Sequence, residues 1–434
     1  MSTHTKFSRR QTLGLLGGAG AGLVSLSMPA IAQGQTAGRV VIVGGGFGGA
    51  TAAKYIKRGN PKLQVTLVEP VKRFYTCPFT NLHFGGLRTF EQQGHGYDEL
   101  RGLGVQVVHE LAKDVDNKKK TVTLAGGRTL NYDKLVLSPG IDIRWGALAG
   151  YDEAAAQLAP HAWQAGPQTQ LLKKQLDAMP DGGLFILSAP ANPFRCPPGP
   201  YERISMVAHY FKTRKPKSKI LVLDAKDAFS KQGLFQDGWK KFYGEMVEWV
   251  PLAKDGKVVK VDAKNLEVET EFGKKHKAAV LNVVPPQKAG AIADRAGVTD
   301  SSGWVPIKPQ TFESAQVADI YVVGDATAAA PMPKSGFVAN AQAKVAAANI
   351  LASFAGKPAP QPAWLNTCYS LIAPDYGISV ANVYAVTDGK LVEMKDTGGV
   401  SPRQASDDFR KLEAQYGVAW YNAIAQDSWG TRAA

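Results

Sequence analysis

Three cysteines are the residues of this 434-residue sequence best suited to redox or nucleophilic chemistry, namely Cys77, Cys196 and Cys368. In an oxidising compartment cysteines pair as disulfides, and an odd number leaves one thiol that needs a separate explanation. The sequence contains no Cys-x-x-Cys-His motif, so we do not expect this chain to attach a c-type haem. The seven histidines lack the spacing of metal ligands, and we predict no metal site.

A glycine-rich segment near the N-terminus has the pattern of a dinucleotide-binding loop. Residues 39–43 predict a short buried strand, the loop 44–49 (GGGFGG) follows it, and residues 50–58 predict a helix. The first turn of such a helix offers unpaired N–H groups and the positive end of its dipole to phosphate. The order of strand, loop and helix makes this interpretation more specific than a glycine-rich turn alone.

Individual positions of this loop have separate physical roles. Gly44 makes the tight turn, Gly46 lets the backbone approach a pyrophosphate, and Gly49 lets the helix pack on the strand. A second predicted strand, 64–68, ends at an acid that would bind the ribose hydroxyls of the adenosine half. The predicted residues of this half of the site are Gly44, Gly46, Phe47, Gly49 and Glu69.

Two further segments favour FAD over NAD as the dinucleotide. Residues 129–140 (TLNYDKLVLSPG) resemble the second FAD segment of the disulfide-reductase-like flavoproteins, and residues 320–326 (IYVVGDA) resemble their third. In the third segment the acid, here Asp325, holds the ribityl chain. A helix predicted for 337–354 would then stabilise negative charge on the reduced flavin ring. The flavin-binding residues predicted from these segments are Gly324, Asp325, Lys334, Ser335 and Gly336.

A second predicted strand-to-helix junction, in the middle of the chain, lacks the glycines of a nucleotide site. The strand 184–188 runs into residues 189–200 (APANPFRCPPGP), where prolines replace the glycines and remove N–H donors. Cys196 lies where a nicotinamide cofactor would bind. We therefore expect neither NADH nor NADPH to be used.

The segments around the three cysteines resemble the flavoprotein subunit of flavocytochrome c sulfide dehydrogenase. They are residues 75–78 (YTCP), 194–203 (FRCPPGPYER) and 365–370 (LNTCYS). The resemblance extends from about residue 39 to 430. It implies FAD bonded through its 8α-methyl carbon to the sulfur of Cys77, and a redox-active disulfide between Cys196 and Cys368 beside the ring. It also implies a heterodimer in which a c-type cytochrome subunit holds the haem and takes the electrons.

These features predict an enzyme, a sulfide dehydrogenase that oxidises sulfide to sulfur or polysulfide. Sulfide would attack the disulfide by thiol–disulfide exchange, and the released thiolate would pass two electrons to the flavin. We assign the sulfur-accepting role to Cys196 and the position nearer the flavin to Cys368. Glu202, near the start of a predicted helix, could accept the proton of the incoming sulfide.

Two other functions stay open. A sulfide:quinone oxidoreductase would perform the same chemistry with a membrane acceptor and would need an exposed amphipathic C-terminal helix. Residues 407–425 could form a helix, but we interpret their apolar positions as few and small. A non-catalytic flavin-binding partner protein is the other alternative, and it would not need the full set of cysteines.

The segment order predicts the elements that position these residues. We expect an α/β fold with two Rossmann-like dinucleotide-binding domains of the disulfide-reductase-like flavoprotein type, plus a C-terminal α+β interface domain. Residues 37–150 and 286–358 would form the FAD-binding domain, and 151–285 an NAD-like domain without nucleotide. Residues 361–434 would cover the flavin and contact the partner.

The N-terminus and the net charge bear on location and partners. Residues 1–32 predict a twin-arginine signal peptide, with paired arginines, a short apolar run and a small-x-small cleavage site, so we expect a periplasmic protein. No stretch is long and apolar enough to predict a transmembrane segment. The formal net charge of +14 suits an anionic substrate or an acidic partner. No groove-reading motif accompanies the basic residues, so we expect no nucleic-acid binding.

Overall fold

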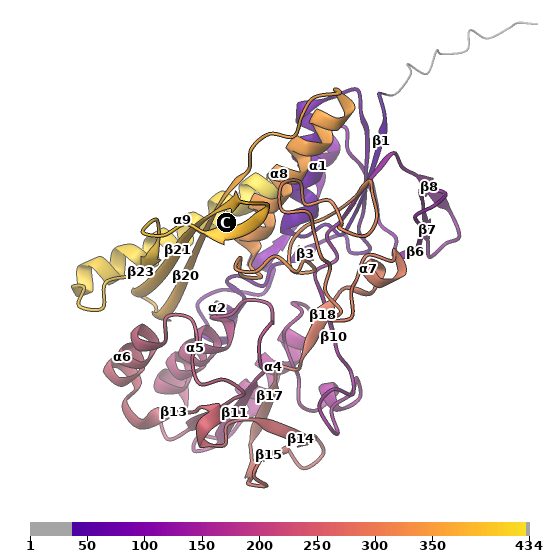
Figure 1. The fold of residues 1–434 in the computed structure, drawn as a ribbon. Coiled ribbons are helices and arrows are strands. Elements are labelled where there is room, and N and C mark those ends of the chain that lie inside the picture. The colour runs from indigo at the N-terminus through magenta and orange to yellow at the C-terminus, as the bar shows by residue number, and fades with distance from the viewer. Residues whose placement is uncertain (1–36, 431–434) are drawn as a thin grey trace, which may run out of the picture. The chain divides into compact units, whose positions relative to one another are not determined.

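The structure, a computed structural model, describes residues 37–430, and the signal peptide predicted for residues 1–32 lies outside this range. The described chain forms two parallel sheets and an antiparallel C-terminal sheet (Figure 1). The predicted fold class, α/β with two Rossmann-like sheets and a C-terminal α+β part, is confirmed. No helix of residues 37–430 is long and apolar enough to cross a membrane.

The first parallel sheet has the strand order β19-β9-β1-β2-β5. Its strands are β1 (Arg39–Val43), β2 (Gln64–Val68), β5 (Gln106–Val108), β9 (Lys134–Leu137) and β19 (Ile320–Val322). Four of the five residues of β1 are buried, because both faces of a parallel sheet are covered. Helices α1 (Phe47–Gly59) and α8 (Gly336–Phe354) lie side by side on one face. On the other face pack the antiparallel strands β6 (Ala112–Asp116), β7 (Thr121–Leu124) and β8 (Thr129–Asn131).

The second parallel sheet has the order β13-β12-β11-β17. Its strands are β11 (Leu184–Ala189), β12 (Lys219–Asp224), β13 (Val247–Val250) and β17 (Val280–Val283). One face packs against α4 (Pro167–Ala178), α5 (Gly199–Arg214) and α6 (Gln232–Tyr243). The other face packs against an antiparallel sheet of β14 (Val258–Asp262), β15 (Glu267–Thr270) and β16 (Lys275–Lys277).

Short elements connect the two parallel sheets. Strands β10 (Ile141–Ile143) and β18 (Gln287–Ala289) pair antiparallel where the chain leaves the first sheet and where it returns. Further short elements are β3 (Phe74–Tyr75), β4 (Gly94–His95), α2 (Thr80–Phe84), α3 (Asp98–Gly102) and α7 (Ala291–Arg295). The loop between β3 and α2 carries Cys77 toward the second sheet, because α2 packs on α5.

The C-terminal part is an antiparallel sheet with one long helix. Its strands are β20 (Ala363–Ala373), β21 (Tyr376–Thr387), β22 (Lys390–Glu393) and β23 (Gly399–Val400), and the helix is α9 (Asp407–Trp429). Strand β20 contacts α8 from the first sheet and α5 from the second. Residues on β20 are therefore placed between the two Rossmann-like parts.

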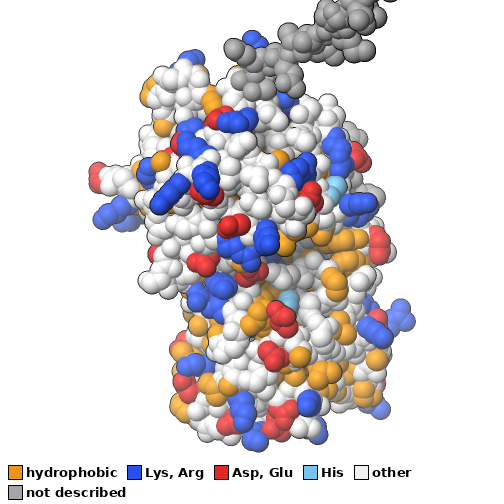
Figure 2. All heavy atoms as spheres, turned by 90° about the vertical axis from the view of Figure 1, so that its right-hand side faces the viewer, with side chains coloured by type: hydrophobic (Ala, Val, Ile, Leu, Met, Phe, Trp, Pro, Cys, Tyr) orange, Lys and Arg blue, Asp and Glu red, His pale blue; other side chains and the backbone are white. Residues whose placement is uncertain are grey.

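The surface carries charges of both signs. On the face shown in Figure 2, lysine and arginine side chains alternate with aspartate and glutamate side chains. Elsewhere on the described surface, charged groups form ion pairs such as Arg403 with Asp237, whose net contribution to stability is small. The positive net charge is therefore spread over this face and not gathered in one patch of it.

Candidate active site

A cavity of about 600 Å³ lies at the carboxyl ends of the strands of the first sheet. Parallel α/β sheets bind their ligands at this edge. Twelve of the predicted site residues line it, from all three parts of the fold: Gly44, Gly46, Phe47, Glu69, Cys77, Cys196, Glu202, Gly324, Asp325, Ser335, Gly336 and Cys368. The structure therefore brings together residues that are spread over most of the chain.

Two predicted residues, Gly49 and Lys334, do not line the cavity. A Cβ atom at Gly49 would lie 1.8 Å from the carbonyl oxygen of Gly44, so this glycine permits helix packing. The Lys334 ammonium turns away and donates to the backbone oxygens of Asp325, at 2.9 Å, and Thr327, at 2.6 Å. Lys334 thus holds the loop behind Asp325, and its predicted role in binding the flavin stays a prediction.

The phosphate end of the cavity is built around the predicted loop. Gly44 has φ +98°, and a Cβ atom there would lie 2.2 Å from the oxygen of Ser138, so only glycine fits. Gly46 is the N-cap of α1, and the first turn of this helix has no acidic residue. The first turn of the helix therefore adds no negative charge against an anion bound at its N-terminus.

The acid at the end of β2 supports this loop. One oxygen of Glu69 accepts the backbone N–H of Gly45 at 2.7 Å, and the other accepts that of Val71 at 3.0 Å. Burial raises the pKa of this carboxyl, and these two hydrogen bonds oppose the rise. Trp429, near the end of the described chain, donates from Nε1 to the Gly45 oxygen at 3.0 Å. The C-terminal helix is thereby attached to the dinucleotide loop.

The middle of the cavity has buried polar atoms without partners among the described residues. They are Oδ1 of Asp325, Nε and Nη2 of Arg195, and Nε1 of Trp420. An unsatisfied buried polar atom costs roughly 1–3 kcal/mol, so such groups usually belong to a ligand site. A carboxylate and a guanidinium side by side fit the hydroxyls of a ribityl chain and the polar edge of a flavin. The residues present therefore fit FAD, with the phosphates at the start of α1 and the ribityl chain at Asp325.

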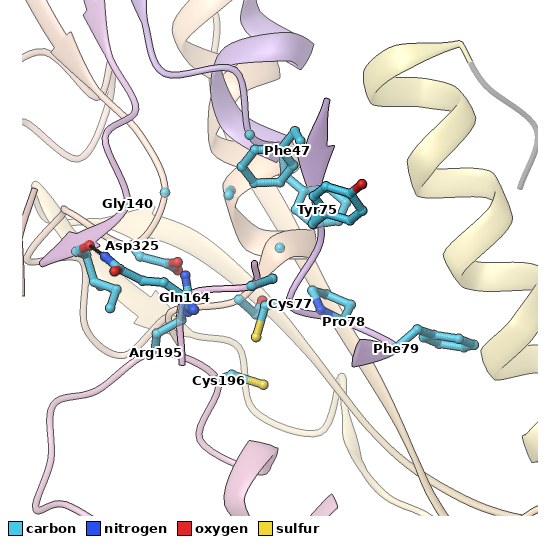
Figure 3. Close-up of a pocket in the computed structure, with 18 of the residues that line it drawn as sticks. Phe47, Tyr75, Cys77, Pro78, Phe79, Gly140, Gln164, Arg195, Cys196 and Asp325 are labelled. Carbon is cyan, nitrogen blue, oxygen red and sulfur yellow. Dashed lines mark hydrogen bonds between the residues drawn. The ribbon is translucent and has the colours of Figure 1, made fainter. Parts of the chain in front are cut away.

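The three cysteines meet beyond this polar region and are free thiols in the structure. The sulfurs of Cys77 and Cys196 lie close together (Figure 3), and the Cys196 thiol hydrogen-bonds the Cys77 sulfur. This bond lowers the pKa of Cys77 to about 6 against the effect of burial, and the charges of Arg195 and Arg203 contribute. The disulfide between Cys196 and Cys368 is not formed here and stays a prediction.

The pKa values of the other two thiols are raised. The pKa of Cys196 is raised by its hydrogen bond to Cys77, by burial and by the negative charge of Glu202. Burial raises the pKa of Cys368 to about 11, and the charge of Lys231 opposes the rise. In this free-thiol form the lowered pKa makes Cys77 the most easily ionised of the three thiols.

The loop from β11 to α5 faces the flavin cavity and not a second nucleotide. Arg195 and Cys196 both line the cavity, and the Cys196 backbone N–H donates to the oxygen of Lys334 at 2.8 Å. Cys196 has φ +58°, a strained value for a residue with a side chain, which this bond and the following helix hold in place. Helix α5 has Pro198 at its N-cap, so donors that a phosphate would need are missing.

Glu202 lies in the first turn of α5 and faces Cys196 and Cys368. Its Oε1 accepts the hydroxyl of Ser370 at 2.6 Å, and its Oε2 accepts Nδ2 of Asn81 at 3.3 Å. Burial raises the pKa of its carboxyl above the ordinary value. A raised pKa at the cavity wall suits a proton acceptor that works near neutral pH.

Several residues of this site were not predicted from the sequence. Arg195 directly precedes Cys196, and Ser370 follows Cys368 by two positions, so it projects from the same face of β20. Their spacing from the cysteines could have predicted that these two residues belong to the site. Lys231 and Asn81 come from other elements, and nothing in their local sequence indicates the site.

Comparisons with known proteins agree with this site. Residues 169–285 match the family described as the central part of the sulfide dehydrogenase [flavocytochrome c] flavoprotein chain, and residues 360–429 match the flavocytochrome c sulphide dehydrogenase flavin-binding family. Residues 38–173 match the pyridine nucleotide-disulphide oxidoreductase family. The flavocytochrome c families thus cover the segments of Cys196 and Cys368.

Individual relatives are of two kinds, the flavocytochrome c flavoprotein chain and sulfide:quinone oxidoreductase. The sulfide dehydrogenase [flavocytochrome c] flavoprotein chain of Chlorobaculum thiosulfatiphilum is 63% identical over 43 residues, which are 10% of this chain and 90% of that one. The mitochondrial sulfide:quinone oxidoreductase of Mus musculus is 23% identical over 318 residues, 72% of this chain and 70% of that one. The sulfide:quinone oxidoreductase structure from Aquifex aeolicus superimposes with a TM-score of 0.70 over 91% of this chain and 93% of that one, and its 19% identity shows the fold alone. The chain therefore belongs to the family of flavocytochrome c sulfide dehydrogenase flavoproteins, which are flavin-dependent sulfide oxidoreductases.

Proposed function

We propose that this protein oxidises sulfide to sulfur or polysulfide with bound FAD and passes the electrons to a c-type cytochrome subunit. The observation that carries the proposal is the meeting of three cysteines and a partly buried glutamate in one cavity with the flavin-binding loops. Membership of a family named for a flavocytochrome c supports the haem-bearing partner. The twin-arginine signal predicted for residues 1–32 supports a periplasmic location.

The sulfur chemistry follows from the cysteine pair. We infer that Cys196 and Cys368 form a disulfide in the oxidised enzyme. A hydrosulfide ion attacks the sulfur of Cys196, the disulfide bond breaks, and Cys368 leaves with the electron pair as a thiolate. The carboxylate of Glu202 then takes the proton of the newly formed persulfide on Cys196.

Positive charges around the cysteines favour this step. Arg203 is buried, and its guanidinium donates to the carbonyl of His161 at 3.1 Å and to Oδ1 of Asn282 at 2.9 Å, which fixes it beneath the cavity. Its charge and that of Arg195 attract hydrosulfide and stabilise thiolates. Bound FAD would supply an acceptor for two electrons that releases them one at a time.

We further propose that the sulfur of Cys77 bonds covalently to the 8α-methyl carbon of the flavin. Three observations support this role. Cys77 lines the cavity, its lowered pKa makes it a thiolate near neutral pH, and it lies on the loop after β3 rather than on β20 or before α5. With Cys77 bonded to the flavin, Cys196 would be left to pair with Cys368.

Acid denaturation tests the covalent bond. After denaturation in acid and filtration through a membrane that retains protein, the yellow colour should stay with the wild-type chain. The Cys77→Ser protein should fold and bind FAD, and all of its flavin should pass into the filtrate. Free flavin in the wild-type filtrate would contradict the bond and would favour a Cys77–Cys196 pair, which their contact in the structure allows.

The electron acceptor has a second candidate, quinone. The C-terminal helix carries larger apolar side chains than the few and small ones predicted from its sequence. Four large apolar side chains are exposed on α9: Phe409, Leu412, Tyr416 and Val418. The first three share one face of the helix, and Trp420 continues this face into the cavity wall. This apolar face suits either a protein partner or a membrane surface.

One anaerobic assay tests the proposed function and its acceptor. Sulfide should bleach the flavin absorbance, whereas NADH and NADPH should not do so at a competitive rate, because prolines at the start of α5 remove backbone N–H donors that a dinucleotide phosphate needs. After sulfide, c-type cytochrome should be reduced and a soluble quinone should not. Reduction of quinone alone identifies a sulfide:quinone oxidoreductase, and reduction of neither would leave a non-catalytic flavin-binding protein.

A further inference from the structure

A continuous row of hydrogen-bonded side chains leads from the cavity wall into the protein. The ammonium of Lys231 donates to Oγ of Ser370 at 2.6 Å, and Ser370 donates to Oε1 of Glu202 at 2.6 Å. The three residues come from different elements, because Lys231 caps α6, Ser370 lies on β20 and Glu202 on α5. Two successive bonds of this length leave the ammonium nitrogen within about 5 Å of the carboxylate.

The charge of Lys231 is buried and has no carboxylate of its own. Its side chain is 6% exposed, and Ser370 is 1% exposed. Among residues 37–430 Lys231 forms no ion pair within 4 Å, and its other hydrogen-bond acceptor is the backbone oxygen of Cys368 at 3.4 Å. A buried cation is costly unless a nearby anion compensates it. Glu202, reached through the serine hydroxyl, supplies that charge.

We propose that Lys231, acting through Ser370, is a positioning residue that keeps Glu202 ionised and oriented toward the two cysteines of the sulfur chemistry. This inference rests on the proposed role of Glu202 as the proton acceptor. Burial favours the protonated form of this partly buried carboxyl, which cannot take a proton, and the nearby ammonium favours the ionised form. The lysine and the serine together thus make the glutamate usable as a base.

The electrostatic surroundings of Glu202 agree with this role. Burial raises the pKa of its carboxyl, and the charge of Lys231 is the largest of the opposing effects, before the hydrogen bonds from Ser370 and Asn81 and the charge of Arg203. The titratable groups that also face it are Cys196, before α5, and Cys368, on β20. Removing Lys231 therefore raises the pKa of Glu202 further, and the ionised form is lost at a higher pH.

An infrared titration of the Glu202 carboxyl tests the role of Lys231 without enzymatic turnover. The carbonyl stretch of the protonated carboxyl is isolated by subtracting the spectrum of Glu202→Gln at each pH. In Lys231→Met the band should appear at a pH higher than in wild type by roughly one unit or more. In Ser370→Ala the band should shift in the same direction by a smaller amount, and in Lys231→Arg it should appear at the wild-type pH. Lys240→Met removes an exposed lysine of the same helix and should shift nothing.

The pH–rate profile of flavin reduction by sulfide connects the titration to function. Its acid limb should move to higher pH in Lys231→Met, and the same substitution should not move it in a Glu202→Gln background. An unshifted carboxyl band in Lys231→Met and Ser370→Ala would overturn the inference. It would also be overturned if Lys231→Met still moved the acid limb of the pH–rate profile in the Glu202→Gln background, because the titration of Cys368 would then be responsible. If Lys231→Met does not fold with flavin, Ser370→Ala decides alone. A shifted band in a protein that sulfide does not reduce would refute the proposed function and leave the electrostatic role standing.

Discussion

We expect the Cys368→Ser and Cys196→Ser proteins to bind FAD normally and to lose sulfide-dependent flavin reduction by on the order of 10³-fold or more. Without either thiol no disulfide can form, so hydrosulfide has no sulfur to attack and no leaving thiolate. Serine has nearly the size of cysteine, and both side chains lie at a cavity wall, so neither substitution opens a cavity in the core. The measurement is anaerobic stopped-flow bleaching of the flavin, with flavin content as the reference.

A purely structural bridge gives the opposite result. Strand β20 and the loop before α5 are already joined by packing of β20 on α5 and by the Ser370–Glu202 hydrogen bond. A structural bond between them would therefore add stability, typically about 2–4 kcal/mol, and no chemistry. Both serine proteins would then unfold at a lower temperature and keep their turnover for each folded molecule. Normal turnover in a well-folded Cys368→Ser protein would end the catalytic assignment.

The Gly46→Val protein should fold and contain little or no flavin. Gly46 has φ −71°, which valine can adopt, and the atoms nearest to a Cβ atom there belong to the ring of Phe74, the first at 3.1 Å. The valine methyl groups would, however, occupy the space at the start of α1 where a pyrophosphate must approach the N–H groups. The flavin-to-protein absorbance ratio after purification measures the loss, and circular dichroism measures folding.

A matched substitution separates a blocked site from a damaged fold. Gly102 ends α3 and is exposed, and a Cβ atom there would meet no other atom within 4 Å, so Gly102→Val should keep its flavin. Gly49→Val should instead fail to fold, because its Cβ atom would lie 1.8 Å from the Gly44 oxygen. Full flavin occupancy in Gly46→Val would contradict the placement of the phosphates at this loop.

The dinucleotide site was predictable because its signal is local in the sequence. The turn at Gly44, the helix start at Gly46 and the acid Glu69 follow from the backbone geometry of one strand–loop–helix–strand unit. The two parallel sheets were predictable for a similar reason, since strands buried on both faces have continuous apolar sequences, as in β1. The family followed from short motifs around the cysteines, and the comparisons confirmed it.

Other features depended on the tertiary structure. The sequence assigned Lys334 to the flavin by its position near Asp325, but the direction of its side chain is set by the carbonyl oxygens behind that residue. The exposed apolar face of α9 could be recognised only once packing showed which side of the helix is buried. Side-chain direction and helix phase are decided by neighbours that are distant in the chain.

The sequence alone determined that this protein has an FAD-type dinucleotide loop, a middle domain without its nucleotide glycines, and three cysteines in motifs of a sulfide-oxidising family. Only the tertiary structure decided that Lys231, Ser370 and Glu202 form one hydrogen-bonded row beside Cys368. The physical reason is that short-range patterns encode backbone conformation. The electrostatics of a buried carboxyl, in contrast, depend on charges that the fold brings from separate elements.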